Sequence, residues 1–191
     1  MLGAASNSAH VLPDLLKPGL KIVFCGTAAG NVSAARGAYY AHPQNRFWSA
    51  LHAFGLTPRK LRPEDYAELP QWGVGLTDVA KHVSGMDREL PAGALGPDAC
   101  AALKAKITAA EPEWLAFTSL TAGRRYLGRP AGFGEQPERG RQAAPSMPVV
   151  VPAVDILEDP TDGLDIGVRL RVCVVHIAAS IGGLPGTIMC L

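Results

Sequence analysis

Residues 20–30 read Leu-Lys-Ile-Val-Phe-Cys-Gly-Thr-Ala-Ala-Gly, and this stretch decides the fold. After Lys21 the run to Cys25 is continuously apolar, which is typical of a strand buried on both faces of a parallel sheet. The small residues from Gly26 to Gly30 predict a tight turn where that strand ends. In α/β proteins a turn at this place commonly forms one wall of a ligand pocket.

The rest of the chain predicts helices and strands in alternation. Helices are expected over residues 46–54, 63–69, 98–110, with Asp98 as the cap, and 119–127. Strands are expected over residues 74–79, 114–118, 149–151 and 168–177. Residues 1–17 read as a loosely structured start, and residues 83–96 and 129–148 as loops. We therefore predict an α/β fold, a three-layer α/β/α sandwich around a mostly parallel central sheet, in one domain over residues 1–191.

Composition fits a folded domain and gives little support to nucleic-acid binding on its own. Hydrophobic residues make up 48% of the chain, charged residues make up 18%, and the formal net charge is only +1. The charge is uneven, however, at +4 over residues 1–150 and −3 over residues 151–191. The arginines between residues 124 and 141 form either a phosphate-facing strip or an ordinary solvated face.

The cysteine spacing does not indicate a metal site, and the apolar end of the chain does not indicate a membrane span. Cys25, Cys100, Cys173 and Cys190 stand far apart without metal-binding spacing, so we expect reduced thiols, no metal, no other cofactor and a cytoplasmic location. Cys25, at the end of an apolar strand, is expected in the core. Residues 172–191 are apolar but interrupted by His, Gly-Gly and Pro, so we expect no membrane partner.

One further segment is specific enough to indicate a family. Residues 41–48 read Ala-His-Pro-Gln-Asn-Arg-Phe-Trp. This stretch, at its distance from the Gly26–Gly30 turn, resembles the His-Pro-x-Asn-Arg-Phe-Trp motif of the mismatch-specific uracil/thymine-DNA glycosylases, a family of the uracil-DNA glycosylase superfamily. Residues 22–26 and 73–78 also fit this family, and the resemblance covers about residues 20–130.

The resemblance implies a monomeric, monofunctional DNA glycosylase of base excision repair. Such an enzyme flips uracil or a related deaminated base out of DNA and hydrolyses its N-glycosidic bond. By position, Tyr40 corresponds to the aromatic residue that stacks on the base, although a plain core role stays open. Backbone groups of the turn would hold the leaving base, which places Gly26, Thr27, Ala28 and Gly30 in the binding site.

Other residues of the motif and its surroundings carry two interpretations each. His42 and Asn45 are expected at the base, but His42 also suits bracing of the loop before Pro43, and Asn45 suits capping of the following helix. Phe47 and Trp48 are expected in the core. Arg36, Arg124 and Arg125 are candidates for DNA phosphate contacts, and Ser119 is expected to cap the helix that carries the last two.

Two departures from the family pattern leave the catalyst open. The family turn reads Gly-Ile-Asn-Pro-Gly, and its Asn positions the attacking water, whereas Ala28 occupies that place here. Asn31 is the nearest substitute, or else a turn residue tolerant of unusual backbone angles. Asp155, after the fourth expected strand, is a second candidate for activating water.

The second departure concerns residues 152–191, which are atypical for the family. The family has a Pro-rich loop there that enters the minor groove, whereas this chain has an acidic stretch that would repel phosphate. A frameshifted reading or a lineage-specific replacement would explain the change. Two alternatives to the enzyme therefore stay open: a catalytically weak or inactive protein that binds uracil-DNA, and a nucleotide- or sugar-phosphate-binding α/β enzyme.

Overall fold

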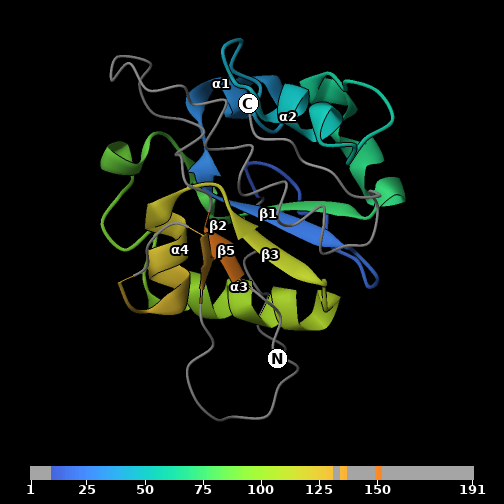
Figure 1. Cartoon of the computed structure of the whole chain (residues 1–191). Helices are drawn as coiled ribbons and strands as arrows, with labels where there is room; N and C mark the ends of the chain where they lie inside the picture. Colours follow the sequence, from blue (N-terminus) through green and yellow to red (C-terminus); the bar gives the residue numbers. More distant parts are fainter. Residues whose placement is uncertain (1–9, 131–133, 137–148, 152–191) are drawn as a thin grey trace, which may run out of the picture.

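The protein folds around a twisted, mostly parallel sheet (Figure 1). The computed structural model describes residues 10–130, 134–136 and 149–151. Within them the sheet has five strands in the order β2-β1-β3-β5-β4. Their bounds are β1 (Ile22–Ala29), β2 (Val74–Ser84), β3 (Trp114–Phe117), β4 (Gly134–Gln136) and β5 (Val149–Val151). Neighbouring strands run parallel except for the antiparallel pair β4 and β5.

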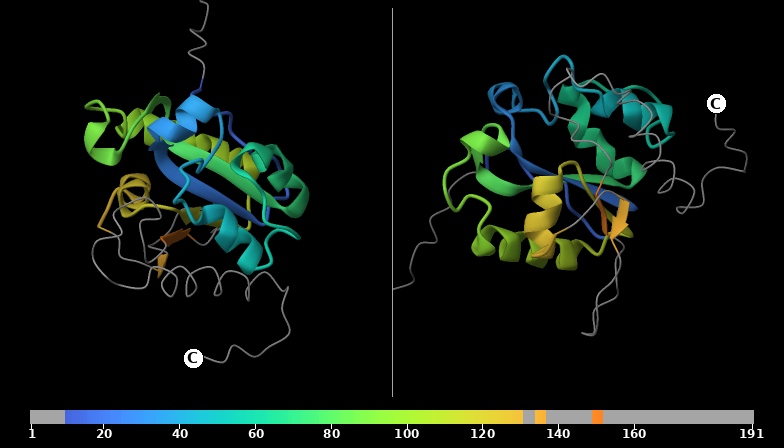
Figure 2. Two further views of the ribbon diagram at one scale, coloured as in Figure 1. Left: turned by 90° about the horizontal axis from the view of Figure 1, so that it is seen from above. Right: turned by 60° about the vertical axis from the view of Figure 1, so that its left-hand side comes forward.

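Helices cover both faces of the sheet, which confirms the three-layer α/β/α architecture (Figures 1 and 2). One face is covered by α1 (Asn31–Arg36), α2 (Phe47–Ala53) and the 3-10 helix η1 (Pro63–Trp72), the other by α3 (Pro97–Ala110) and α4 (Leu120–Leu127). Because side chains alternate along a strand, Phe24 of β1 packs in the hydrophobic cluster under α2 and η1, and Val23 and Cys25 pack in the cluster under α3 and α4. The prediction of Cys25 as a core residue is confirmed.

Strand β1 is longer than the sequence predicts. Residues 26–29, expected as a turn, continue the strand, and Gly26 pairs with Asp78 and Ala28 with Ala80 before an irregularity at Ala29. Gly30 is the N-cap of α1, a helix that stands where the sequence predicts a loop. The physical reason is local: Gly37 adopts a left-handed conformation, with φ of 62°, and ends the helix after six residues, too few to show a helical pattern.

Other boundaries agree with expectation, with a few corrections. Helix α2 and strands β3 and β5 lie where predicted, and Ser119 caps α4 by accepting a hydrogen bond from the Ala122 amide at 3.0 Å. Asp98 is not a cap, because Gly96 is the N-cap of α3 and Asp98 lies in its first turn. Strand β4 and the short 3-10 helix η2 (Asp87–Glu89) occupy segments predicted as loops. The strand expected over residues 168–177 lies outside the described residues.

The start of the chain is more ordered than predicted over residues 10–17. Leu15 forms an antiparallel bridge with Leu76, and the Val11 amide donates to the carbonyl of Lys81 at 2.8 Å. Leu12 is only 1% exposed. The segment thus covers the outer edge of β2, and the reason is the unpaired backbone groups that an edge strand presents. Within the described ranges no helix is long and apolar enough to cross a membrane.

Candidate active site

Polar side chains gather at the edge of the sheet where β1, β2 and β3 end. Pairing between β1 and β3 stops at Cys25 and Phe117, whereas pairing between β1 and β2 continues to Ala29. Residues 26–29 of β1 therefore extend past the end of β3, beside Thr118 and Ser119. The carboxyl edge of a parallel sheet is the usual place for a ligand site in an open α/β fold.

Asp78 occupies the space directly over Gly26. The side chain of Asp78 is buried, and the residue is 4% exposed. A Cβ atom added at Gly26 would lie 2.5 Å from Oδ1 of Asp78 and 3.6 Å from Oγ1 of Thr118. A side chain at position 26 would therefore displace the carboxylate, and the bare backbone of β1 forms the floor of the site.

The carboxyl group of Asp78 has an unusual proton affinity. Burial raises its pKa from the ordinary 3.8 to about 6, with the negative charge of Asp14 acting in the same direction. Lys81, whose Nζ lies 3.7 Å from Oδ2 of Asp78, lowers the pKa and limits the rise. The group therefore titrates close to neutral pH, which is the range in which a carboxylate serves as a general base.

Three hydroxyl groups tie β1, β3 and the start of α4 together at the site. Oγ1 of Thr27 lies 2.7 Å from Oγ of Ser119, which also accepts the capping bond from the Ala122 amide. Because Ser119 already accepts there, it can donate its own proton to Thr27. Thr118 donates to the carbonyl of Cys25 at 3.4 Å. These bonds fix the geometry of the edge beside Asp78.

Tyr40 forms an aromatic wall on the same side of the sheet. Its ring stacks on that of Phe47, with centroids 3.9 Å apart at 28°, and its hydroxyl lies 3.4 Å from Oγ1 of Thr118. The residue is 6% exposed, and burial raises the pKa of its phenol, which keeps it neutral. Its φ of 51° is unusual for a residue with a side chain and marks a constrained loop.

The loop before α2 is held mainly by its own residues. Nδ1 of His42 accepts from the Gln44 amide at 3.3 Å, and His42 is exposed. Oδ1 of Asn45 accepts from the Phe47 amide at 2.8 Å, so the side chain bonds the first residue of α2, but the N-cap of that helix is Arg46 and not Asn45. Phe47 and Trp48 are buried, as predicted. Contacts of Tyr40, His42 and Asn45 with a substrate stay predictions.

The two predicted catalytic residues fall in different places. Asn31 is the exposed first residue of α1, so the interpretation as a turn residue with unusual angles is wrong, while its catalytic role stays a prediction. Asp155 lies outside the described residues. Ala28 is buried on β1. It lies between Gly26, which pairs with Asp78, and Ala29, which pairs with Ser84.

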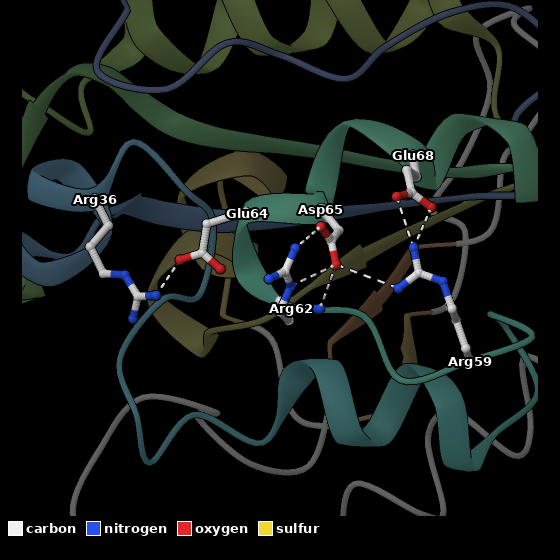
Figure 3. A network of polar contacts seen from close by, with 6 residues as sticks. All are labelled: Arg36, Arg59, Arg62, Glu64, Asp65 and Glu68. Atoms are coloured by element: carbon white, nitrogen blue, oxygen red, sulfur yellow. Dashed lines mark hydrogen bonds and ion pairs between the residues drawn. The ribbon is translucent and has the colours of Figure 1, made fainter.

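Arg36 is engaged by protein groups rather than left open. Its guanidinium forms an ion pair with Glu64 (Figure 3). The same group donates to the carbonyl of Ala41 at 3.0 Å. Nearby, Arg59 donates to both carboxylate oxygens of Glu68 at 2.8 Å. Arg59 and Arg62 also pair with Asp65, which lowers the pKa of that carboxyl to about 2. Each of these three arginines is thus paired with at least one carboxylate.

Arg124 and Arg125 lie on the exposed side of α4. Together with Thr121, Arg129 and Pro130 they line a surface hollow of about 470 Å³. The hollow runs from Thr121, in the first turn of α4 and two residues after Ser119, to Arg129 and Pro130 beyond the end of the helix. The arrangement concentrates guanidinium groups around one depression, as a phosphate contact requires. Their predicted role at DNA phosphates stays a prediction.

Sequence reasoning missed Asp78, Thr118 and Lys81. A signal was present, because Asp78 follows the apolar stretch at the start of β2, and a polar residue at the carboxyl end of a buried strand points to a site. The sequence does not show the register between β1 and β2, which places Asp78 opposite Gly26.

Comparison with known families agrees with this geometry. A family model described as the uracil DNA glycosylase superfamily matches residues 13–155 of the chain. The matched region contains every described strand, the loop with Tyr40, and Asp78. Among the residues that the structure describes, no group of three or more His, Cys, Asp or Glu side chains is arranged to hold a metal ion.

Proposed function

The chain belongs to the uracil-DNA glycosylase superfamily, and on that premise we propose that it is a monofunctional DNA glycosylase that excises uracil or a related deaminated base. The observation that carries the proposal is the buried carboxylate of Asp78 above Gly26, at the carboxyl end of β1. It supplies a water-activating group in a chain that has Ala28 where the resembling family has its catalytic Asn.

In this mechanism Asp78 accepts a proton from the water that attacks C1′ of the deoxyribose. As the new C1′–O bond forms, the glycosidic C1′–N bond breaks and its electron pair leaves with the base. The products are an abasic sugar bearing a hydroxyl group and the free base, which is protonated afterwards by solvent. The buried position of Asp78 suits this step, because a carboxylate in a dry site is a stronger base than one in water.

The walls of the site account for the other requirements. A flipped pyrimidine needs an aromatic surface, and Tyr40 supplies one that is braced from behind by Phe47. The leaving base carries negative charge, which backbone N–H groups of the segment beyond Cys25 are suited to stabilise, since β3 no longer pairs there.

The experiment compares the native protein with Asp78→Asn on oligonucleotides that contain one uracil, as single strands and as duplexes, followed by alkaline cleavage of abasic sites. Loss of the general base is expected to lower the single-turnover rate by about 10²- to 10⁴-fold and to leave binding of uracil-DNA largely intact. The matched control is Asp98→Asn, an exposed carboxylate on α3, which should excise at the native rate.

Two outcomes would contradict the proposal. If the native protein binds uracil-DNA but releases no base from a panel of deaminated and alkylated lesions, the chain is a damaged-DNA-binding protein, as the loss of the family Asn would allow. If Asp78→Asn excises as fast as the native protein, another group activates the water, and Asn31→Ala is the next variant to assay.

A further inference from the structure

Lys81 is a buried lysine three residues after Asp78 on β2. Its side chain is only 5% exposed. A lysine is almost never fully buried unless it is paired, because removing the ammonium group from water is costly. The groups that surround the Lys81 ammonium therefore show which side chains its positive charge influences.

The Lys81 ammonium group has three acceptors around it. Nζ lies 2.9 Å from Oδ1 of Asp14, donates to the hydroxyl of Tyr39 at 2.8 Å, and lies 3.7 Å from Oδ2 of Asp78. The contact with Tyr39 is a hydrogen bond, and the contacts with Asp14 and Asp78 are ion pairs, the second of them longer than a hydrogen bond. Lys81 thus joins the candidate catalytic carboxylate to a second, partly buried carboxylate, that of Asp14.

Asp14 is itself held firmly from the other side. Its oxygens accept from Oγ1 of Thr77 at 2.7 Å and from Nζ of Lys106 at 2.6 Å, and Nδ1 of His10 lies 3.7 Å away. The backbone of the same segment is bonded to β2 at Leu76 and Lys81. Asp14 therefore has a fixed position from which it competes with Asp78 for the charge of Lys81.

The charges around Asp78 act in opposite directions. Lys81 favours the ionised carboxylate, whereas burial and the negative charge of Asp14 favour the protonated form. The neighbouring Tyr40 phenol and Cys25 thiol are neutral, because burial raises the pKa of each. The opposing charges of Lys81 and Asp14 are thus the part of the surroundings that sets the proton affinity of Asp78.

We propose that Lys81 is a positioning residue that keeps the Asp78 carboxylate ionised and oriented over Gly26, and that Asp14 determines how much of the Lys81 charge acts on it. The inference rests on the proposed role of Asp78 as general base. It assigns a catalytic purpose to the segment before β1, whose Asp14 acts on the site through the charge of Lys81.

The test is the pH dependence of single-turnover base excision for two variants with opposite expected shifts. In Lys81→Met the acid limb should move to higher pH by at least about one unit, so that activity falls about tenfold near pH 5 and about twofold near neutrality, and recovers as the pH rises. In Asp14→Asn the acid limb should move to lower pH. Lys104→Met, an exposed lysine of α3, is the matched control and should keep the native profile.

A purely structural role for Lys81 predicts something different: a lower rate at every pH with an unchanged midpoint. That result in Lys81→Met, or an upward shift in Asp14→Asn, would overturn the inference. The two variants are independent, so misfolding of one leaves the other decisive. Lys81→Arg, which retains the charge, should restore the midpoint toward the native value.

A second readout does not depend on excision. The carboxyl carbon of Asp78 can be titrated by NMR in the native protein and in both variants, and its midpoint should move in the directions given above. If the native protein releases no base but these shifts appear, the proposed function fails while the electrostatic coupling stands. If excision depends on Asp78 but neither variant moves the midpoint, the function stands and the coupling is refuted.

Discussion

Asp78 is a residue whose proposed function carries a cost in stability. Its pKa in the folded protein is about 6, against an ordinary 3.8, so the folded state binds this proton more tightly than the unfolded chain does. The contribution of Asp78 to stability is therefore unimpaired below about pH 4 and is lost as the pH rises through about 6. A pKa difference of two units corresponds to about 3 kcal/mol of stability lost at high pH. An asparagine at this position would recover only part of it, because its buried amide is also polar.

We accordingly expect Asp78→Asn to raise the free energy of unfolding by about 2 kcal/mol near pH 8 and by almost nothing near pH 4. Lys81 keeps Asp14 and Tyr39 as partners in the variant, so its charge is not left unpaired. Urea denaturation at both pH values measures the difference. A variant less stable than the native protein at the higher pH would show that Asp78 is a structural rather than a strained catalytic residue.

Gly26 offers an independent probe of the same carboxylate. In Gly26→Ala the new methyl group would lie 2.5 Å from Oδ1 of Asp78, so the carboxylate must move. We expect excision to fall by at least about tenfold, because a displaced base loses the geometry of proton transfer. The fold should survive, since the obstructing atom belongs to a side chain that can shift.

A double-mutant cycle with Asp78→Ala decides whether that loss acts through Asp78. If it does, adding Gly26→Ala to Asp78→Ala costs no further activity. Additive losses would instead mean that the methyl group blocks the substrate itself, as the original prediction of Gly26 in the binding site requires.

The residues of the site divide into those that the sequence could predict and those that it could not. Tyr40 directly precedes the motif of residues 41–48, which contains Asn45 and Phe47, so their proximity follows from the chain itself. The pairing of Gly26 with Asp78 joins two segments far apart in sequence, and a shift of the register by one residue would turn Asp78 to the other face of the sheet. Only the structure fixes that register.

At the scale of elements, long periodic segments were predictable and short ones were not. Strand β2 was expected over residues 74–79, and it continues five residues beyond the predicted Val79, to Ser84. Helix α1 was missed because six residues make less than two turns. Strand β4 has three residues and no apolar pattern, and it exists because β5 offers it an edge to pair with.

The ion pair between α1 and η1 gives a prediction for these two elements. Arg36 reaches a DNA phosphate only if the phosphate replaces Glu64 as its partner. We therefore expect Glu64→Gln to strengthen DNA binding and Arg36→Gln to weaken it. Arg36→Gln removes one phosphate contact, so the slope of log affinity against log salt should fall in magnitude by about 0.9, whereas Glu64→Gln removes only the competing carboxylate and should leave the slope near its native value.

Glu68→Gln is the matched control, because it loosens the neighbouring pair with Arg59 and leaves Arg36 untouched. Fluorescence anisotropy on a uracil-containing duplex at several salt concentrations gives both quantities. If Glu64→Gln and Glu68→Gln change the affinity equally, the effect is one of general charge, and Arg36 is not a phosphate ligand.

For the molecule as a whole, the two ends of the parallel sheet have different surfaces. The carboxyl edge carries Asp78 and the start of α4, near the hollow lined by Arg124 and Arg125. The amino edge carries a second hollow, of about 610 Å³, lined partly by Lys17 and Lys21. The α/β architecture was predictable from the alternation of strands and helices, but the sequence gives no measure of which basic residues share an edge with the site.

DNA bound in register with Asp78 must contact the carboxyl edge and not the amino edge. We expect the double variant Arg124→Gln with Arg125→Gln to lower the salt slope of DNA binding by up to about 1.8, the value for two phosphate contacts, and to weaken binding most at low salt. The double variant Lys17→Gln with Lys21→Gln removes the same charge and should leave the slope near its native value. Anisotropy titrations over about 50 to 200 mM salt measure both. Equal losses from the two pairs would mean that DNA is attracted by the overall charge of the protein, and an effect confined to the lysines would place the DNA at the opposite end of the sheet, away from Asp78.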